Sequence, residues 1–119
     1  MDKQGNQQND IEKMAKDYQL AQEQLRIVTL QLEQLKAQSA ELDGAKEQLD
    51  KATGKTYTTI GGIMVETDRA KALADVADRA ELTKARIQSI NKQYVDIKSR
   101  EKELGEKITE IYKAQGAMQ

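Results

Sequence analysis

The sequence predicts a mainly α-helical chain, in which two long helices pair antiparallel as a coiled-coil hairpin with one β-hairpin at its centre. Three observations favour this fold. Apolar residues recur in alternating steps of three and four through both halves of the chain. Between the halves, TYTTIGGIMVE (Thr56–Glu66) is rich in β-branched residues and carries two central glycines. Charged residues make up 33% of the 119 residues, yet the net charge is −1 and Pro, Phe and Trp are absent, which is more typical of a helical rod than of a compact globule.

The first helix is expected over residues 10–52, after a polar lead at 1–9 that is expected to be disordered. Asn9 and Glu12 resemble a capping box at its start, and Gly54 is the expected left-handed cap at its end. Between these signals the steps of three and four meet a mostly apolar seam, consisting of Ile11, Met14, Tyr18, Ala21, Leu25, Val28, Leu32, Leu35, Ser39, Leu42, Lys46 and Leu49. A heptad pattern of this length predicts a coiled coil.

The second helix is expected over residues 68–115, with Thr67 or Asp68 as its N-cap. Its seam consists of Leu73, Val76, Ala80, Thr83, Ile87, Ile90, Tyr94, Ile97, Glu101, Leu104, Ile108, Ile111, Gln115 and Met118. The two helices have similar expected lengths, roughly 64 and 72 Å at 1.5 Å per residue. A chain reversal between them would therefore pair them along nearly their whole length.

The register of this pairing follows from counting outward from Gly61–Gly62. The count places Leu25 near Ile97 and Val28 near Tyr94, to within several residues. Four seam positions are polar, namely Ser39, Lys46, Thr83 and Glu101. We expect them to fix the register at some cost in stability, and a buried functional charge is the less favoured interpretation.

The β-hairpin is expected over residues 55–67, with Gly61–Gly62 as a two-residue turn of type I′ or II′. In that register Ile60 faces Ile63 and Thr58 faces Val65 on one side of the sheet. The other side carries Tyr57, Thr59, Met64 and Glu66. One face is thus distinctly apolar.

An isolated two-stranded hairpin is marginally stable in water and has two open edges. Helices that leave its base are expected to run away from it, so its apolar face and its edges need partners from other chains. The plainer interpretation is a simple turn, but a connection between helices needs only two to eight residues. The predicted subunit interface consists of Tyr57, Thr58, Ile60, Gly61, Gly62, Ile63, Met64 and Val65.

The sequence offers little chemistry for catalysis, metal binding or a cofactor. With neither Cys nor His, the usual nucleophiles, general bases and metal ligands are missing, so we expect no enzyme. TGKT at Thr53–Thr56 lacks the first glycine of a phosphate loop, because Leu49 stands at that position. Dispersed basic residues, the lack of a long apolar run and a polar N-terminus argue against nucleic acid, a membrane and secretion. We therefore expect a cytoplasmic protein.

The run Tyr57–Val76, YTTIGGIMVETDRAKALADV, resembles the junction between the hairpin and the second helix in β-type prefoldin subunits, both archaeal and eukaryotic. The resemblance rests on an aromatic residue, a Gly-containing turn, alternating aliphatics and a later Leu, here Tyr57, Gly61, Ile63, Met64, Val65 and Leu73. The layout of helix, single hairpin and helix extends the resemblance over residues 1–119 as one domain. A single hairpin is similar to the β-type class, since α-type subunits have two.

The resemblance implies a hetero-hexamer of two α-type and four β-type subunits, whose hairpins join into an intersubunit β-barrel. It also implies an ATP-independent holdase chaperone, without a cofactor, that binds non-native client proteins at the coiled-coil tips and delivers them to a group II chaperonin. The tip residues expected to bind clients are Ile11, Met14, Tyr18, Ile108, Ile111, Tyr112 and Met118. For each of them the plainer interpretation is the last layer of the seam. The alternative function is a structural coiled-coil tether or scaffold that dimerises through its heptads.

Overall fold

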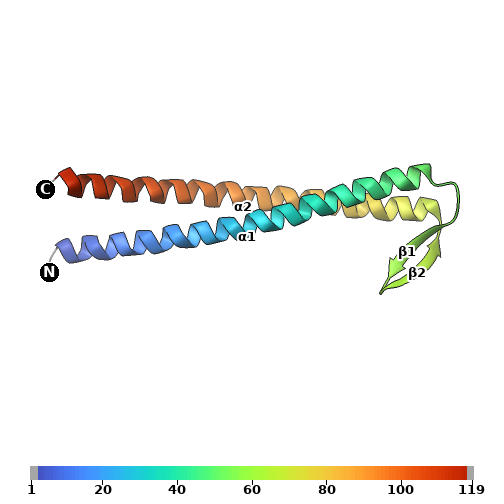
Figure 1. Cartoon of the computed structure of the whole chain (residues 1–119), viewed down its shortest axis with the longest axis horizontal. Helices are drawn as coiled ribbons and strands as arrows, with labels where there is room; N and C mark the ends of the chain where they lie inside the picture. The colour runs from blue at the N-terminus through green and yellow to red at the C-terminus, as the bar shows by residue number, and fades with distance from the viewer. Residues whose placement is uncertain (1–2, 118–119) are drawn as a thin grey trace. The chain divides into compact units, whose positions relative to one another are not determined.

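The computed structural model describes residues 3–117, and its elements follow the predicted order (Figure 1). In chain order these are helix α1 (Lys3–Lys51), strand β1 (Thr56–Ile60), strand β2 (Ile63–Thr67) and helix α2 (Arg69–Ala117). The fold has two compact units. The first contains the described residues of 1–31 and 90–119, and the second contains residues 32–89.

The predicted disorder of residues 1–9 is wrong for residues 3–9, because α1 already begins at Lys3. The predicted capping box is wrong too, since Asn9 lies inside the helix. This stretch contains no proline, and each residue added to an existing helix gains a hydrogen bond without a new nucleation cost. The other predicted boundaries agree with the structure to within two residues, which is the usual margin at helix ends.

The end of α1 is not closed by Gly54, so the predicted left-handed cap is wrong. Gly54 does not have the positive φ that such a cap requires. Instead the Ala52 N–H donates to the Leu49 carbonyl at 3.3 Å, which tightens the last turn. The Arg69 guanidinium also donates to the Asp50 carbonyl at 2.5 Å. One of the carbonyls left free at the helix end is thus satisfied by a cation, which the helix dipole favours there.

The start of α2 follows the prediction at Asp68. The Ala72 N–H donates to the Asp68 carbonyl at 3.0 Å, which is the first helical hydrogen bond and makes Asp68 the N-cap. Thr67, the other predicted candidate, is the last residue of β2. The strand therefore passes into the helix with a single residue between them.

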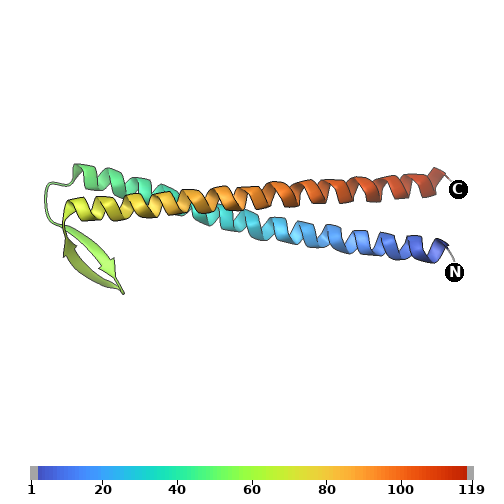
Figure 2. The same cartoon turned by 180° about the vertical axis from the view of Figure 1, so that it is seen from behind.

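In the first unit, α1 and α2 lie side by side and run antiparallel (Figures 1 and 2). Packing is tightest at Ala21, Leu25 and Val28, whose exposed fractions are 1%, 8% and 5%. Gln115 is exposed, and Met118 lies outside the described residues. The other predicted seam residues of this unit are half-buried, namely Ile11, Met14, Tyr18, Ile90, Tyr94, Ile97, Glu101, Leu104, Ile108 and Ile111. The heptad pattern therefore identifies the buried face of both helices.

In the second unit the seam is centred on Leu32 and Thr83, both buried. The Thr83 hydroxyl donates to the Arg79 carbonyl at 2.8 Å, so this buried polar group is satisfied within its own helix. Lys46, predicted on the seam, is exposed, and Ala45 is half-buried beside it. A lysine keeps its ammonium group in water, whereas alanine can be covered without cost.

Leu25→Ala should lower the free energy of unfolding by about 2–3 kcal/mol, because it leaves a cavity in the seam. The matched control is Leu20→Ala in the same helix, where the side chain is 55% exposed and the change should be within about 0.5 kcal/mol. Both variants make the same change in helix propensity. Urea unfolding followed by far-UV circular dichroism at one protein concentration measures both values, and equal losses would contradict the assigned seam.

Candidate functional site

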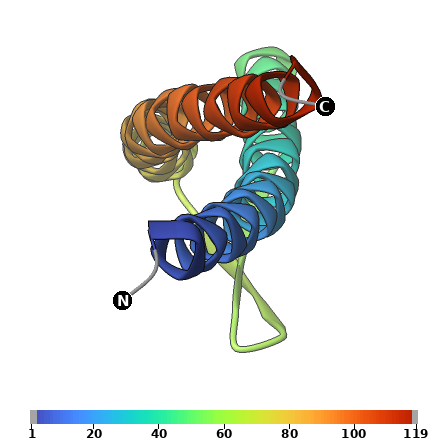
Figure 3. The ribbon, with the colours of Figure 1, turned by 90° about the vertical axis from the view of Figure 1, so that its left-hand side faces the viewer.

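The β-hairpin of the second unit has large apolar side chains that no other part of the chain covers. In the end-on view of Figure 3 it projects to one side of the two helix ends that it joins. The exposed fractions are 51% for Tyr57, 63% for Ile60, 67% for Ile63, 69% for Met64 and 43% for Val65. All five belong to the predicted subunit interface. Of the other predicted interface residues, Thr58 is half-buried, and Gly61 and Gly62 are exposed.

The predicted register of the hairpin is confirmed. Ile60 pairs with Ile63 and Thr58 pairs with Val65, so that these four side chains share one face. The turn glycines, Gly61–Gly62, have φ values of 56° and 81°. Two successive positive φ values are those of a type I′ turn, whose twist suits a hairpin. The sequence thus fixes an apolar face that has no partner within its own chain.

Both edges of this sheet are open. In an antiparallel hairpin the pair that flanks a two-residue turn is hydrogen-bonded, and bonded and non-bonded pairs then alternate. The register therefore directs the N–H and C=O groups of Tyr57 and Thr59 outward from β1, and those of Met64 and Glu66 outward from β2. The described sheet has only these two strands. Either edge can accept a further strand.

The base of the hairpin is better covered than its tip. Thr56 is buried, and its hydroxyl donates to the Thr67 carbonyl at 2.6 Å across the two strands. The last turns of α1 also border one face of the sheet, so the expectation that the helices leave the hairpin wholly uncovered is wrong there. This shallow groove is lined by Gln48, Leu49, Lys51, Ala52, Thr56, Tyr57 and Met64. Tyr57 and Met64 stay more than half exposed within it.

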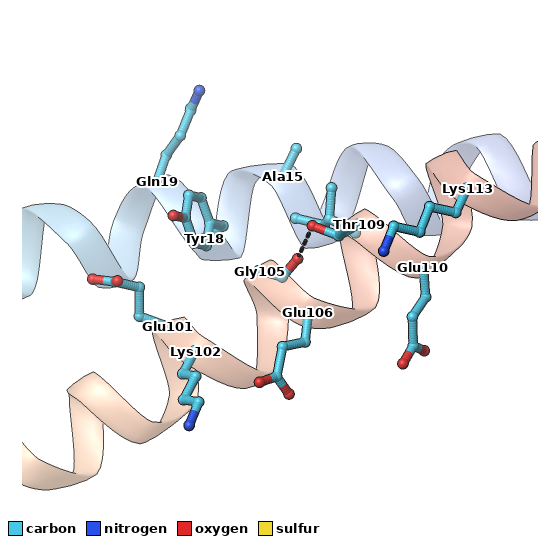
Figure 4. A pocket seen from close by; sticks show the side chains of 11 residues that line it. Ala15, Tyr18, Gln19, Glu101, Lys102, Gly105, Glu106, Thr109, Glu110 and Lys113 are labelled. Atoms are coloured by element: carbon cyan, nitrogen blue, oxygen red, sulfur yellow. Dashed lines mark hydrogen bonds between the residues drawn. The ribbon is translucent and has the colours of Figure 1, made fainter. Parts of the chain in front are cut away.

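A second groove lies in the first unit, between the beginning of α1 and the end of α2 (Figure 4). Tyr18 packs against α2 at Gly105, where an added Cβ would lie 3.3 Å from the Tyr18 Cε2 atom. The Thr109 hydroxyl donates to the Gly105 carbonyl at 2.8 Å. The groove is lined by Ala15, Tyr18, Gln19, Glu101, Lys102, Gly105, Glu106, Ile108, Thr109, Glu110 and Lys113. Its apolar part is therefore surrounded by charges of both signs.

This contact supports the register predicted for the helix pair. The same count from the central glycines that places Leu25 near Ile97 places Tyr18 opposite Gly105. Val28 and Ile97 also line one groove. The heptad pattern alone missed the role of Gly105, although a glycine inside a long helix was a signal that something packs closely there.

The predicted client-binding residues are divided between covered and exposed positions. Tyr18 and Ile108 line the same groove. The seam covers a part of Ile11, Met14 and Ile111, which are half-buried. Tyr112 is 61% exposed, and Met118 lies outside the described residues. The structure thus brings one predicted residue from each helix together, while client binding itself stays a prediction.

The described residues offer contact surfaces and few perturbed ionisable groups. The hydrogen bond from the Arg26 guanidinium lowers the pKa of Glu23 and raises the pKa of Arg26, on an exposed stretch of α1. Among the described side chains, no group of His, Cys, Asp or Glu is placed to hold a metal ion, and no buried polar atom lacks a hydrogen-bond partner. Between residues 3 and 117, neither helix has an apolar stretch long enough to cross a membrane.

Comparisons with known proteins give one consistent result. A family model described as "Prefoldin subunit" matches residues 12–116. The prefoldin subunit beta of Pyrococcus furiosus is 33% identical over 89 residues, which are 73% of this chain and 76% of the relative. That of Pyrobaculum calidifontis is 28% identical over 112 residues, or 92% and 90% of the two chains. The crystal structure of the prefoldin beta subunit from Thermococcus strain KS-1 has the same fold, with a TM-score of 0.80 and 22% identity, covering 86% of this chain and 91% of that one.

Gly105→Ala tests the close contact with Tyr18. Alanine is favoured over glycine in a helix by about 1 kcal/mol, so Gly44→Ala, which meets nothing within 4 Å, should raise stability by that amount. Gly105→Ala should raise it clearly less, because the Tyr18 ring must move. In a Tyr18→Ala background the full gain should return. Urea unfolding of the four variants measures the coupling, and equal gains at both glycines would show that Tyr18 has room to spare.

Proposed function

Because the chain belongs to the prefoldin subunit family, we propose that it is a β-type subunit of an ATP-independent chaperone that holds non-native proteins. One observation supports this proposal above the others. The chain fills its own helical seam at Ala21, Leu25 and Val28, yet leaves the hairpin apolar and open at both edges. A surface of that kind is suited to assembly with other chains.

Assembly in this proposal proceeds by strand addition. Neighbouring hairpins pair with the outward N–H and C=O groups of β1 and β2, and successive additions join the sheets into a barrel without edges. The face of Ile60, Ile63 and Val65 then becomes buried, which stabilises the assembly by about 25 cal/mol per Å² of apolar surface. The assembly is a hetero-hexamer of two α-type and four β-type subunits.

Client binding is assigned to the first unit, which contains both ends of the described chain. Tyr18 and Ile108 offer apolar surface in one groove, and Tyr112 offers more beside the C-terminal end of α2. Each contact is weak, but several subunits that hold one client combine their contacts through a high effective concentration. The client is then delivered to a group II chaperonin in the cytoplasm, without ATP or another cofactor.

A structural tether that dimerises through its heptads is the competing function. Such a protein needs an unfilled heptad seam for its partner. Here the closest-packed seam residues of each unit, such as Leu25 and Leu32, are already buried within the chain. The mass in solution distinguishes the two functions, because a tether forms a dimer alone, whereas a β-type subunit assembles further with an α-type partner.

Replacing Ile63 and Val65 together by Lys should dissolve the assembly, because it places two charges on the face that neighbouring chains cover. The measurement is native mass spectrometry after co-expression with an α-type prefoldin subunit, alongside circular dichroism for helix content. Val95→Lys, at a residue 62% exposed on α2, is the control and should leave the assembly intact. A hexamer that survives in the double variant would disprove strand addition at this face.

A shortened chain of residues 19–107 should still form the hexamer but lose suppression of client aggregation, since it lacks Tyr18, Ile108 and Tyr112. Light scattering of heat-denatured citrate synthase measures the suppression, and sedimentation velocity checks the assembly. A second shortened chain that keeps residues 8–116 is the control, because it retains both sides of the groove. Unchanged suppression by the shorter chain would place client binding elsewhere.

A further inference from the structure

Three aliphatic side chains of α1 lie outside the seam of the first unit. Leu20, Ile27 and Leu30 are 55%, 44% and 48% exposed. Their spacing of seven and three residues keeps them within an arc of about 80° on the helix, at 100° per residue. Scattered surface hydrophobics need no explanation, but three on one side of a helix within eleven positions form a continuous apolar strip. We call this set the aliphatic stripe.

A groove of about 460 Å³ adjoins the stripe within the same unit, and Ile27 belongs to both. The groove is lined by Gln24, Ile27, Val28, Gln31, Gln93, Asp96, Ile97 and Arg100. Val28 and Ile97 give it an apolar floor. The three glutamine side chains each carry two N–H donors and a carbonyl acceptor. The surface thus combines aliphatic contact with amide groups that can bond either a donor or an acceptor.

The charges on this surface occur in opposite pairs. Glu23 and Arg26, on the exposed side of α1, form an ion pair with a distance of 2.5 Å between the Arg26 Nη2 and the Glu23 Oε1. Asp96 and Arg100 are four residues apart on α2, so their opposite charges lie on one side of that helix. A surface of this kind does not select a partner by charge. It is also unsuited to nucleic acid, whose binding depends on unpaired cations.

The size of the stripe decides between two remaining partners. A stable dimer buries roughly 1,200 Å² or more in total, which three half-exposed aliphatic side chains and a shallow groove do not approach. A second copy of this chain is therefore excluded as a lasting partner. An extended polypeptide fits better, because its main chain presents an N–H and a C=O at each residue and its side chains alternate in direction.

We propose that the aliphatic stripe and the adjoining glutamine groove bind an extended, apolar segment of a non-native polypeptide. The glutamine amides of Gln24, Gln31 and Gln93 bond the main chain of the segment, and Leu20, Ile27 and Leu30 contact its aliphatic side chains. The inference rests on the proposed chaperone function and adds a client contact separate from the tip residues. It gives each subunit a second weak contact, which holds a client without selecting its sequence.

The test uses the full chain and, as probe, fluorescently labelled α-lactalbumin that has been reduced and carboxymethylated, so that it stays unfolded and soluble. Fluorescence anisotropy measures the affinity. Leu20→Gln, Ile27→Gln and Leu30→Gln combined should weaken binding about tenfold, because the apolar contact is lost. The matched control combines Leu82→Gln and Val95→Gln, two exposed aliphatics outside the stripe, and should stay within about twofold of the unchanged chain.

Glutamine is a good helix former, so circular dichroism should show the same helix content in every variant. Should the triple variant lose helix, Ile27→Gln alone serves instead, with an expected twofold to threefold loss. Equal affinities in the triple variant and the unchanged chain would overturn the inference while leaving the chaperone proposal standing. An unchanged chain that does not bind the unfolded probe would overturn both. A self-association in sedimentation velocity that the triple variant abolishes would assign the stripe to a second copy and also overturn the inference.

Discussion

The β-hairpin between the helices cannot satisfy its own apolar surface, and the rest of the structure is best understood from that constraint. Two short strands pair once and leave every outward N–H and C=O group of Thr59 and Met64 free. The face that includes Ile60 and Ile63 is more than half exposed. A sheet of this size gains its stability from neighbours, and a connection between two helices does not need one. The hairpin is therefore the part of the molecule that assembly explains.

The helices follow the opposite rule, because they bury their seam within the chain. Ala21, Leu25 and Val28 are covered by the partner helix, and polar seam residues such as Thr83 find a partner in their own helix. What remains exposed on the helices is scattered and charge-balanced, apart from the stripe that contains Ile27. A chain that satisfies its helices alone and its sheet only in company belongs naturally in a family of assembling subunits.

Much of this fold could be predicted from local patterns, since each rests on a rule of short range. The heptad spacing identifies the seam, the paired glycines require a type I′ turn, and Asp68 is a preferred cap. The errors have equally physical causes. Helix propagation through residues 3–9 depends on the helix behind them, and Gly54 is not needed as a cap because Arg69 reaches the end of α1 from another element. The fit of Tyr18 on Gly105 and the exposure of the stripe depend on which faces meet, which no single segment specifies.

Amide hydrogen exchange of the hairpin tests the central claim most directly. In the isolated chain, the outward amides of Thr59 and Met64 should exchange quickly, while the inward amides of Thr58 and Val65 should be slower. In a complex with an α-type prefoldin subunit, at least one outward set should become protected, because neighbouring strands then accept hydrogen bonds from those groups. Outward amides that exchange equally fast in the isolated chain and in the complex would contradict the account.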